Sequence, residues 1–360
     1  MSDAIRQHVY GPVPSRRLGR SLGVDLVPFK TCTYDCIYCQ LGHTTELTTA
    51  RRDYVPVDEI MAQLEEKLRA GPAPDYVSLA GSGEPTLHAR IGELISRIKS
   101  LTSTPVAVLT NGSLLGGRDI QDALREADLV LPSLDAGDAE LFSHINRPHA
   151  DIEFGDMVDG LVTFRERSAK PIWLEVMVLA GITGIRSEVE KIAALARRIR
   201  ADRVQLNTVT RPPCEEFAYP VSPESLASFA RLFGRGASIV NEPRTRRALP
   251  AGAVADGDIL ALLTRRPCTA RGISEGLGVH IGEVTKRLDI LARRGAVAPV
   301  RKDGAVFFET VRGACAREQH FPAGGCASVG SHPAVAPPDT GLQSHGAGKA
   351  SHRCNHRPLL

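Results

Sequence analysis

Short runs of β-forming apolar residues alternate with segments of helical periodicity from Ser21 to about Val240. This alternation is typical of βα units around a parallel sheet, and six such units are too few to close an eight-stranded barrel. The fold class is therefore predicted as α/β, a partial (β/α)6 TIM-like barrel. The predicted strands are Ser21–Leu26, Tyr76–Leu79, Pro105–Leu109, Leu129–Ser133, Ile172–Leu179 and Arg203–Leu206. The predicted helices are Val57–Ala70, Ile91–Ser100, Ile120–Glu126, Phe154–Arg167, Ser187–Arg200 and Pro223–Phe233.

A second pattern begins after Pro250. Helical periodicity covers Asp256–Thr264, Ile273–Leu277 and Ile281–Arg294, and two alternating runs, Val297–Arg301 and Ala305–Thr310, flank the hairpin signal Asp303-Gly304. Three helices followed by a hairpin predict a small C-terminal winged helix-turn-helix. From about residue 312 the chain is rich in Gly, Ala, Ser, Pro and His without periodicity, which predicts a disordered tail. The predicted domains are residues 1–245 for the barrel, 252–311 for the winged helix and 312–360 for the tail.

Composition narrows the class of protein. The hydrophobic content of 42% and the charged content of 24% are ordinary for a soluble globular protein. The 44 Lys and Arg against 41 Asp and Glu give a net charge of +3, too small to predict nucleic-acid binding by the whole chain. About 18 consecutive apolar residues, which a membrane-spanning helix needs, occur nowhere, and Met1–Tyr10 lacks the apolar stretch of a secretory signal. We expect a cytoplasmic protein without a membrane partner.

Three cysteines lie within eight residues as Cys32-Thr-Tyr-Asp-Cys36-Ile-Tyr-Cys39. Three soft thiolate ligands on one loop suit an iron–sulfur cluster that keeps one iron open. A structural zinc site is an alternative, but it needs four ligands and no second CxxC pair follows. A thioredoxin-type pair formed by Cys36 and Cys39 is another, and Cys32 upstream argues against it. An auxiliary cluster is not expected, because the other cysteines are widely separated: Cys214, Cys268, Cys315, Cys326 and Cys354.

Polar or ligating residues follow five of the predicted strands. In a parallel barrel the carboxyl ends of the strands meet at one mouth, where catalytic groups lie. The sequence therefore predicts that these segments converge. They are the cysteine loop after the first strand, Gly81–Pro85 after the second, Thr110–Gly112 after the third, Ser133 and Asp135 after the fourth, and Asn207 at the end of the sixth.

The cysteine spacing and the Gly-Glu-Pro turn together make residues 10–240 resemble the radical S-adenosylmethionine (radical SAM) superfamily. The segments Gly11–Gly19, Ser21–Asp25 and Cys36–Gly42 look like a branch of small prokaryotic Fe–S oxidoreductases related to the tRNA wyosine-synthesis proteins. More distantly, they resemble the molybdopterin-biosynthesis cyclase. The usual Gly-Gly-Glu of the superfamily reads Ser82-Gly83-Glu84 here.

The resemblance implies an enzyme with two cofactors, a [4Fe–4S] cluster and S-adenosylmethionine. Cys32, Cys36 and Cys39 would be the catalytic metal ligands, and the open iron would bind S-adenosylmethionine. Reductive cleavage of that cofactor would give a 5′-deoxyadenosyl radical that abstracts hydrogen from substrate, with an electron donor such as flavodoxin or ferredoxin as partner. The residues expected to bind S-adenosylmethionine are Tyr38, Gly81, Gly83, Glu84, Asn111, Ser133 and Asp135.

The substrate and net reaction stay open at this point: hydrogen abstraction, methyl transfer and ring rearrangement all fit. Guanidinium groups suit phosphate or carboxylate, so Arg16, Arg17, Arg20 and Arg147 are candidates to meet an anionic substrate such as a nucleotide or tRNA. His43 could hydrogen-bond the cluster. A different class of function is a cluster-containing redox or iron sensor that binds nucleic acid through basic residues of the winged helix. These residues are Lys286, Arg287, Arg293, Arg294, Arg301 and Lys302.

Overall fold

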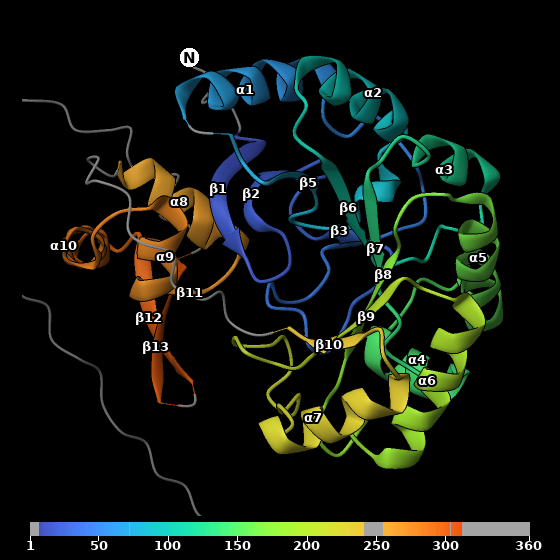
Figure 1. Cartoon of the computed structure of the whole chain (residues 1–360). Helices are drawn as coiled ribbons and strands as arrows, with labels where there is room; N and C mark the ends of the chain where they lie inside the picture. Colours follow the sequence, from blue (N-terminus) through green and yellow to red (C-terminus); the bar gives the residue numbers. More distant parts are fainter. Residues whose placement is uncertain (1–6, 72, 241–254, 303, 312–360) are drawn as a thin grey trace, which may run out of the picture. The chain divides into compact units, whose positions relative to one another are not determined.

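The structure is a computed structural model that describes residues 7–71, 73–240, 255–302 and 304–311. The expected domain boundaries at 245 and 252 and the expected tail from 312 lie outside these residues. Figure 1 shows a curved sheet with helices along its outer side, as expected for a partial barrel. No helix within the described ranges is both long and apolar enough to span a membrane.

The sheet runs in the order β1-β2-β5-β6-β7, and bridges from β7 to β8 continue it through β8-β9-β10. Every pairing from β2 onward is parallel, while β1 is an antiparallel edge strand. All six predicted strands are confirmed with small shifts at their ends. The strands are β1 (Val9–Ser15), β2 (Gly19–Val24), β3 (Thr31–Cys32), β4 (Glu46–Leu47), β5 (Tyr76–Leu79), β6 (Val106–Thr110), β7 (Leu129–Pro132), β8 (Trp173–Met177), β9 (Arg203–Asn207) and β10 (Ala237–Ile239).

The helices cover the outer side of the sheet with one apolar face each. In α1, for example, Val57, Ile60 and Leu64 are buried at helical spacing while charged residues lie on the other face. The helices are α1 (Val57–Ala70), α2 (Ile91–Leu101), α3 (Arg118–Ala123), α4 (Ala139–Asn146), α5 (Phe154–Arg167), α6 (Arg186–Ile199) and α7 (Pro223–Ala230), with 3-10 turns η1 (Pro85–Leu87) and η2 (Arg231–Phe233).

Three differences from the predicted elements have physical reasons. Strand β1 carries a glycine and two prolines, which an edge strand tolerates. These residues interrupt the alternation of apolar and polar positions by which a strand is predicted. Helix α4 begins at the cap Asp138, whose side chain accepts from the amide of Leu141, and it is short enough to escape a periodicity search. The predicted helix Pro223–Phe233 ends as an α-helix at Ala230 and continues as η2.

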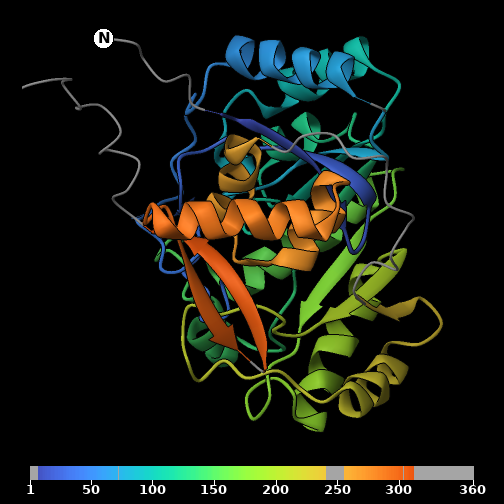
Figure 2. The ribbon, with the colours of Figure 1, turned by 90° about the vertical axis from the view of Figure 1, so that its left-hand side faces the viewer.

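The C-terminal module consists of three helices and a three-stranded antiparallel sheet. Figure 2 shows its last helix lying across the view with the hairpin beside it. The order of elements agrees with the expected pattern, and the assignment as a winged helix stays a prediction. The elements are α8 (Asp256–Arg265), β11 (Cys268–Thr269), α9 (Ala270–Leu277), α10 (Ile281–Arg293), β12 (Val297–Lys302) and β13 (Ala305–Thr310).

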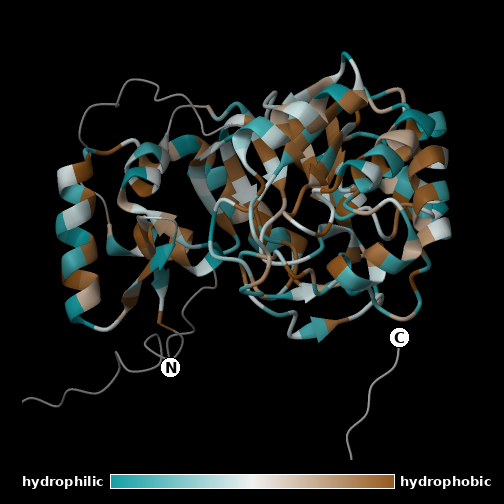
Figure 3. Cartoon of the chain, turned by 90° about the horizontal axis from the view of Figure 1, so that it is seen from below, coloured by the Kyte–Doolittle hydropathy of each residue, from teal (hydrophilic) through white to brown (hydrophobic). Residues whose placement is uncertain are grey.

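Two of the three apolar clusters among the described residues show how these parts are held together. The larger one lies between the sheet and its helices, where Figure 3 shows hydrophobic colouring concentrated. The smaller one joins Val13 of β1 to Ile259, Val284 and Leu288 of the C-terminal module. Strand β1 therefore contributes to both the barrel sheet and the core of the module, which places the module beside the barrel strands that lead into the mouth.

Candidate active site at the barrel mouth

The cysteine loop starts at the end of β3 and is fastened to the end of α4. The amide of Asp35 donates to the carbonyl of Asn146 at 3.0 Å, and the amide of Ile37 donates to the carbonyl of Ile145 at 2.9 Å. Within the loop, the amide of Cys39 donates to the carbonyl of Cys36 at 3.1 Å. The loop is thus fixed by backbone hydrogen bonds, and its three thiols lie on an ordered frame.

Each of the three sulfur atoms has its own nitrogen donor. Lys30 Nζ lies 3.1 Å from Cys39 Sγ, and Asn146 Nδ2 lies 3.5 Å from Cys36 Sγ. Asn111 Nδ2 makes a longer contact of 3.7 Å with Cys32 Sγ. Such donors stabilise negative charge on a ligating sulfur and tune the potential of a bound cluster.

Burial makes free thiolates unfavourable at this site. It raises the pKa of the Cys32 thiol to about 12, with a further contribution from the Glu84 carboxylate. Burial also holds the pKa of Cys36 well above its usual range, with help from the neighbouring cysteines. A coordinated metal deprotonates such thiols outright. The site therefore suits cysteines that become ionised through ligation rather than in the free protein.

The Gly81–Glu84 turn packs directly against the cysteine strand. Lys30 N donates to the carbonyl of Ser82 at 2.6 Å, and Glu84 N donates to the carbonyl of Thr31 at 3.1 Å. A Cβ atom on Gly83 would lie 1.9 Å from that same Thr31 oxygen, so only glycine permits this approach. Gly81 adopts φ +127°, and a Cβ there would lie 1.6 Å from an oxygen of Asp25. Glycine is thus required at both predicted positions.

Glu84 is 2% exposed and its carboxylate is occupied by the chain itself. Oε1 accepts from the amide and hydroxyl of Thr86 at 3.0 and 2.6 Å and from the hydroxyl of Thr110 at 2.6 Å. Oε2 accepts from the amide of Asn111 at 2.7 Å. Burial raises the pKa of Glu84, and these four hydrogen bonds oppose the rise. These hydrogen bonds connect the turn to the end of β6. Glu84 is not among the cavity-lining residues, and its contact with S-adenosylmethionine stays a prediction.

Tyr38 and Asp135 form a polar network behind the cysteine loop. The Tyr38 hydroxyl donates to Oδ2 of Asp135, which also accepts from Asn146 Nδ2 at 3.1 Å. Oδ1 accepts from the amide of Met177 at 2.9 Å. Burial raises the pKa of Asp135 to about 6. Ser133 bridges to Glu175 of the next strand, and neither Ser133 nor Asp135 is among the cavity-lining residues.

Tyr34 supplies a test of whether the site accepts a further group. Its side chain is 2% exposed, and its hydroxyl has no hydrogen-bond partner among the described residues. The charges of Cys36, Glu84 and Asp135 all act on this hydroxyl, which shows that it lies among the site residues. A buried hydroxyl without a partner, on a residue between Cys32 and Cys36, fits a site built around a group that the chain alone does not supply.

Sequence reasoning missed Lys30 and Asn146 as partners of the cysteines. Nothing in the local sequence distinguishes Lys30 from a surface lysine, and Asn146 lies next to Arg147, whose guanidinium is the more obvious candidate for an anionic ligand. Arg147 forms an ion pair with Glu215 at 2.6 Å and does not line the cavity.

His43 is exposed and lies 3.1 Å from Asp35. Among the hydrogen bonds of the described residues, none joins His43 to the three cysteines of the motif.

One cysteine outside the motif comes near this loop. Ligand atoms of Asp35, His43 and Cys214 all lie within 4.8 Å of one another, at the partly exposed edge of the site. Cys268 is buried in the core of the C-terminal module. The remaining cysteines of the chain lie outside the described residues.

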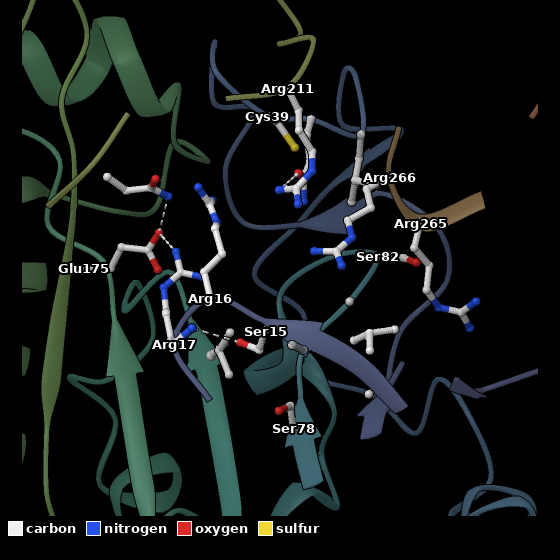
Figure 4. A pocket seen from close by; sticks show the side chains of 18 of the residues that line it. Ser15, Arg16, Arg17, Cys39, Ser78, Ser82, Glu175, Arg211, Arg265 and Arg266 are labelled. Carbon is white, nitrogen blue, oxygen red and sulfur yellow. Dashed lines mark hydrogen bonds and ion pairs between the residues drawn. The ribbon is translucent and has the colours of Figure 1, made fainter. Parts of the chain in front are cut away.

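A cavity of about 380 Å³ opens beside the cysteines. Its lining includes Cys32, Tyr38 and Cys39 together with Gly81–Gly83. The lining also includes apolar residues of the strands, among them Leu109 and Met177. Figure 4 shows arginine side chains around the opening, including Arg16 and Arg17 from the predicted set; Arg20 is not part of the lining.

Comparisons with known proteins show what this chain is similar to. The family model of the radical SAM superfamily matches residues 26–199. A UPF0026 protein of Helicobacter pylori strain J99 is 33% identical over 267 residues, which are 73% of this chain and 85% of that protein. A protein of Brachyspira hyodysenteriae named GTPase Obg is 39% identical over 81% of this chain, and this chain spans only 43% of its length. A radical SAM methyltransferase structure from Sphaerobacter thermophilus superposes with a TM-score of 0.48 at 20% identity, covering 61% of this chain and 65% of that one.

The chain belongs to the radical SAM superfamily and, within it, to the UPF0026 proteins. It is an enzyme, and the cofactors of its family are a [4Fe–4S] cluster and S-adenosylmethionine. Enzymes of this family use a reductant and a substrate.

Proposed function

We propose that this protein reductively cleaves S-adenosylmethionine at a [4Fe–4S] cluster held by Cys32, Cys36 and Cys39, and abstracts hydrogen from a nucleoside, tRNA or small metabolite. The observation that carries the proposal is that Cys32, Cys39 and Gly81–Gly83 line one cavity. When bound, the cluster and S-adenosylmethionine together supply a 5′-deoxyadenosyl radical.

The chain's own residues position and shield these cofactors. Three thiolates would hold three irons, and the donors on their sulfur atoms would stabilise the added electron. The glycine turn would let backbone amides and carbonyls approach the amino-acid part of S-adenosylmethionine. Tyr38, held by Asp135, lines the cavity and would orient the nucleoside part. Asn111 and Ser133 are not among the cavity-lining residues, and their contact with the cofactor stays a prediction. Apolar residues of the lining such as Leu109 would help to exclude water from the reacting centre.

For the C-terminal module we propose a winged helix-turn-helix, supported by three helices followed by a hairpin. Its basic helix does not favour a nucleic-acid sensor as the main function. Arg287 and Arg294 both pair with Asp256 at 3.4 Å, and Arg293 pairs with Asp289 at 3.0 Å. We also propose a cytoplasmic location, supported by the free thiols of the five described cysteines.

The test is anaerobic reconstitution with iron and sulfide, reduction with dithionite, and quantification of 5′-deoxyadenosine from S-adenosylmethionine. Wild-type protein should hold about four irons per chain and release 5′-deoxyadenosine. Cys36→Ala should lose both properties, whereas Cys214→Ala should keep both as a matched control outside the motif. A cluster-loaded wild type that never forms 5′-deoxyadenosine would refute the proposed reaction, and a full iron load in Cys36→Ala would refute the ligand set.

A further inference from the structure

The lining of the mouth cavity is strongly cationic. It includes six side chains that carry positive charge and one carboxylate, that of Glu175. The cationic residues are Arg16, Arg17, Lys30, Arg211, Arg265 and Arg266. Even two ionised cysteines in the same lining leave an excess of positive charge. Such a cavity raises the local concentration of anions and favours an anionic ligand.

Three of these cations pair with a carboxylate or a thiol of the described site. Arg17 donates to Glu175, and Arg265 donates to Asp25 at 2.7 Å. Lys30 donates to Cys39. These three side chains maintain the site, so they are not the groups that would recognise a substrate.

The other three arginines come from three separate segments of the chain, and Arg16 donates to the hydroxyl of Thr210 at 3.2 Å. Arg16 follows β1, Arg211 follows β9, and Arg266 follows α8. Figure 4 shows their guanidinium groups around the opening. The Arg266 side chain is half-buried and makes no hydrogen bond or ion pair with any residue that the structure describes. A guanidinium held at a cavity wall without a protein partner points to a partner that arrives from outside.

The same three arginines also line a second cavity of about 550 Å³. This second cavity lies against the C-terminal module, and its walls add Arg271 and Lys302 with one carboxylate, Glu275. Arg16, Arg211 and Arg266 are therefore the shared wall between the cavity at the cysteines and a second basic cavity. Arg211 Nη1 lies 3.3 Å from Oε1 of Gln40, the residue after Cys39, which links this wall to the cysteine loop.

We infer that Arg16, Arg211 and Arg266 form a phosphate-binding site, and that the substrate of this enzyme carries a phosphate group seated between them. This inference rests on the proposed function and specifies its substrate class. A carboxylate is planar and is satisfied by one guanidinium fork, whereas a tetrahedral phosphate presents oxygens in several directions. Three guanidinium groups on separate segments match the tetrahedral group better.

The position of this site determines how a substrate would lie. The phosphate would sit at the shared wall, and the body of the substrate would extend into the 380 Å³ cavity toward Cys39. A second phosphate, or the next nucleotide of a strand, would extend into the other cavity toward Arg271 and Lys302. A free phosphorylated metabolite and a nucleic-acid strand offer the same group, so the experiment includes a probe for each.

The experiment is calorimetric titration of cluster-loaded protein with inorganic pyrophosphate, with a short single-stranded RNA, and with acetate at matched ionic strength. Arg266→Gln removes one charged donor, which corresponds to about a tenfold loss of pyrophosphate affinity. The pyrophosphate affinity of Arg266→Lys should lie between those of the wild type and Arg266→Gln, because lysine keeps the charge but lacks the two-pronged guanidinium group. The matched control is Arg293→Gln, which removes an equal charge from an exposed side chain outside both cavities. Arg211→Gln is a second variant from the barrel and should weaken binding as well.

Pyrophosphate binding that depends on Arg266 and not on Arg293 supports a site for free phosphorylated metabolites. RNA binding with the same dependence, without pyrophosphate binding, supports a site whose phosphate belongs to a nucleic acid. Absence of both, equal losses in Arg266→Gln and Arg293→Gln, or acetate binding as tight as pyrophosphate binding would overturn the inference. The 5′-deoxyadenosine assay on the same preparation separates this result from the proposed reaction, because either one can fail while the other holds.

Discussion

Lys30 Nζ lies 3.1 Å from Cys39 Sγ, in a position where the lysine is 3% exposed. The backbone of Lys30 has φ +57°, a left-handed conformation that is uncommon for a residue with a side chain. Its amide donates to the carbonyl of Ser82 in the glycine turn. One residue therefore joins the cysteine loop to the turn and places a positive charge beside a proposed cluster ligand.

Replacing Lys30 by methionine should make the cluster harder to reduce. A nearby cation stabilises the more negative, reduced cluster, so its removal lowers the reduction potential. A charge-assisted hydrogen bond of about 1.5–3 kcal/mol corresponds to roughly 60–130 mV for a one-electron couple. Redox titration of the reconstituted protein, monitored by electron paramagnetic resonance, measures this shift.

Lys30→Arg and Lys286→Met are the controls for that titration. Lys30→Arg places a side chain on the same left-handed backbone as Lys30→Met but keeps the positive charge. Its reduction potential should therefore be close to that of the wild type. Lys286 is exposed on α10, and Lys286→Met should leave the reduction potential of the cluster unchanged. Equal potentials in Lys30→Met and wild type would show that the lysine does not act on the cluster.

The ion pair between Arg265 and Asp25 connects the C-terminal module to the barrel. Both side chains are 9% exposed, Arg265 stacks 3.9 Å from the ring centre of Tyr10, and Asp25 accepts from the amide of Ser82 at 2.6 Å. Arg265→Met leaves a buried carboxylate without its cation, and we expect the free energy of unfolding to fall by about 3–5 kcal/mol. Denaturant unfolding measures it.

A double-mutant cycle identifies the source of that loss. Asp25→Asn combined with Arg265→Met should lose less than the two single changes added together, because no buried charge is left alone. The matched exposed pair, Arg293 with Asp289, should contribute below about 0.5 kcal/mol. Strict additivity at Asp25 and Arg265 would contradict a direct pairing.

Gly83→Ala should disrupt the packing of the glycine turn on the cysteine strand. The added methyl group would lie 1.9 Å from the carbonyl oxygen of Thr31, and backbone atoms cannot rotate away as a side chain can. We expect a destabilisation of about 1–3 kcal/mol and a reduced iron load after reconstitution. Gly155→Ala is the matched control, since a Cβ there has no atom within 4 Å. A normal iron load and melting temperature in Gly83→Ala would contradict the described turn.

His88 makes stability depend on pH below neutrality. Burial lowers its pKa below the usual 6.5, although the hydrogen bond to the carbonyl of Val55 at 2.9 Å opposes this. Between the lowered folded pKa and 6.5, the unfolded chain binds more protons than the folded one. The contribution of His88 is therefore complete above pH 6.5 and is lost as the pH falls toward the folded pKa.

The measurement is urea unfolding from pH 7.5 to 5. Wild-type protein should lose more stability over this range than His88→Gln, because glutamine retains a donor for Val55 and does not titrate. Identical pH profiles for the two proteins would mean that His88 is not held neutral in the fold.

Local sequence patterns predicted the parts of this fold and site that depend on neighbours in the chain. Parallel strands such as β6 and β7 are continuous apolar runs bounded by turns, and the cysteine motif fits within eight residues. The resemblance implied that Gly81 and Gly83 help to bind S-adenosylmethionine, and the structure shows a steric reason for glycine at each position.

Contacts between distant segments could not be predicted in this way. Asn146 lies 110 positions from Cys36, and Arg265 lies 240 positions from Asp25. No periodicity connects such pairs, because their meeting depends on how α4 and α8 pack against the barrel. The same holds for Arg211 and Arg266, which look like ordinary surface arginines until the fold brings them to one cavity.

The most direct test of the central claim is the spectrum of the reduced cluster before and after S-adenosylmethionine is added. Three cysteine ligands leave one iron open, so the cofactor should change the electron paramagnetic resonance signal of the wild-type protein, and 5′-deoxyadenosine should then accumulate. A fully loaded, reduced protein whose signal is the same with and without S-adenosylmethionine would contradict an open iron at Cys32, Cys36 and Cys39.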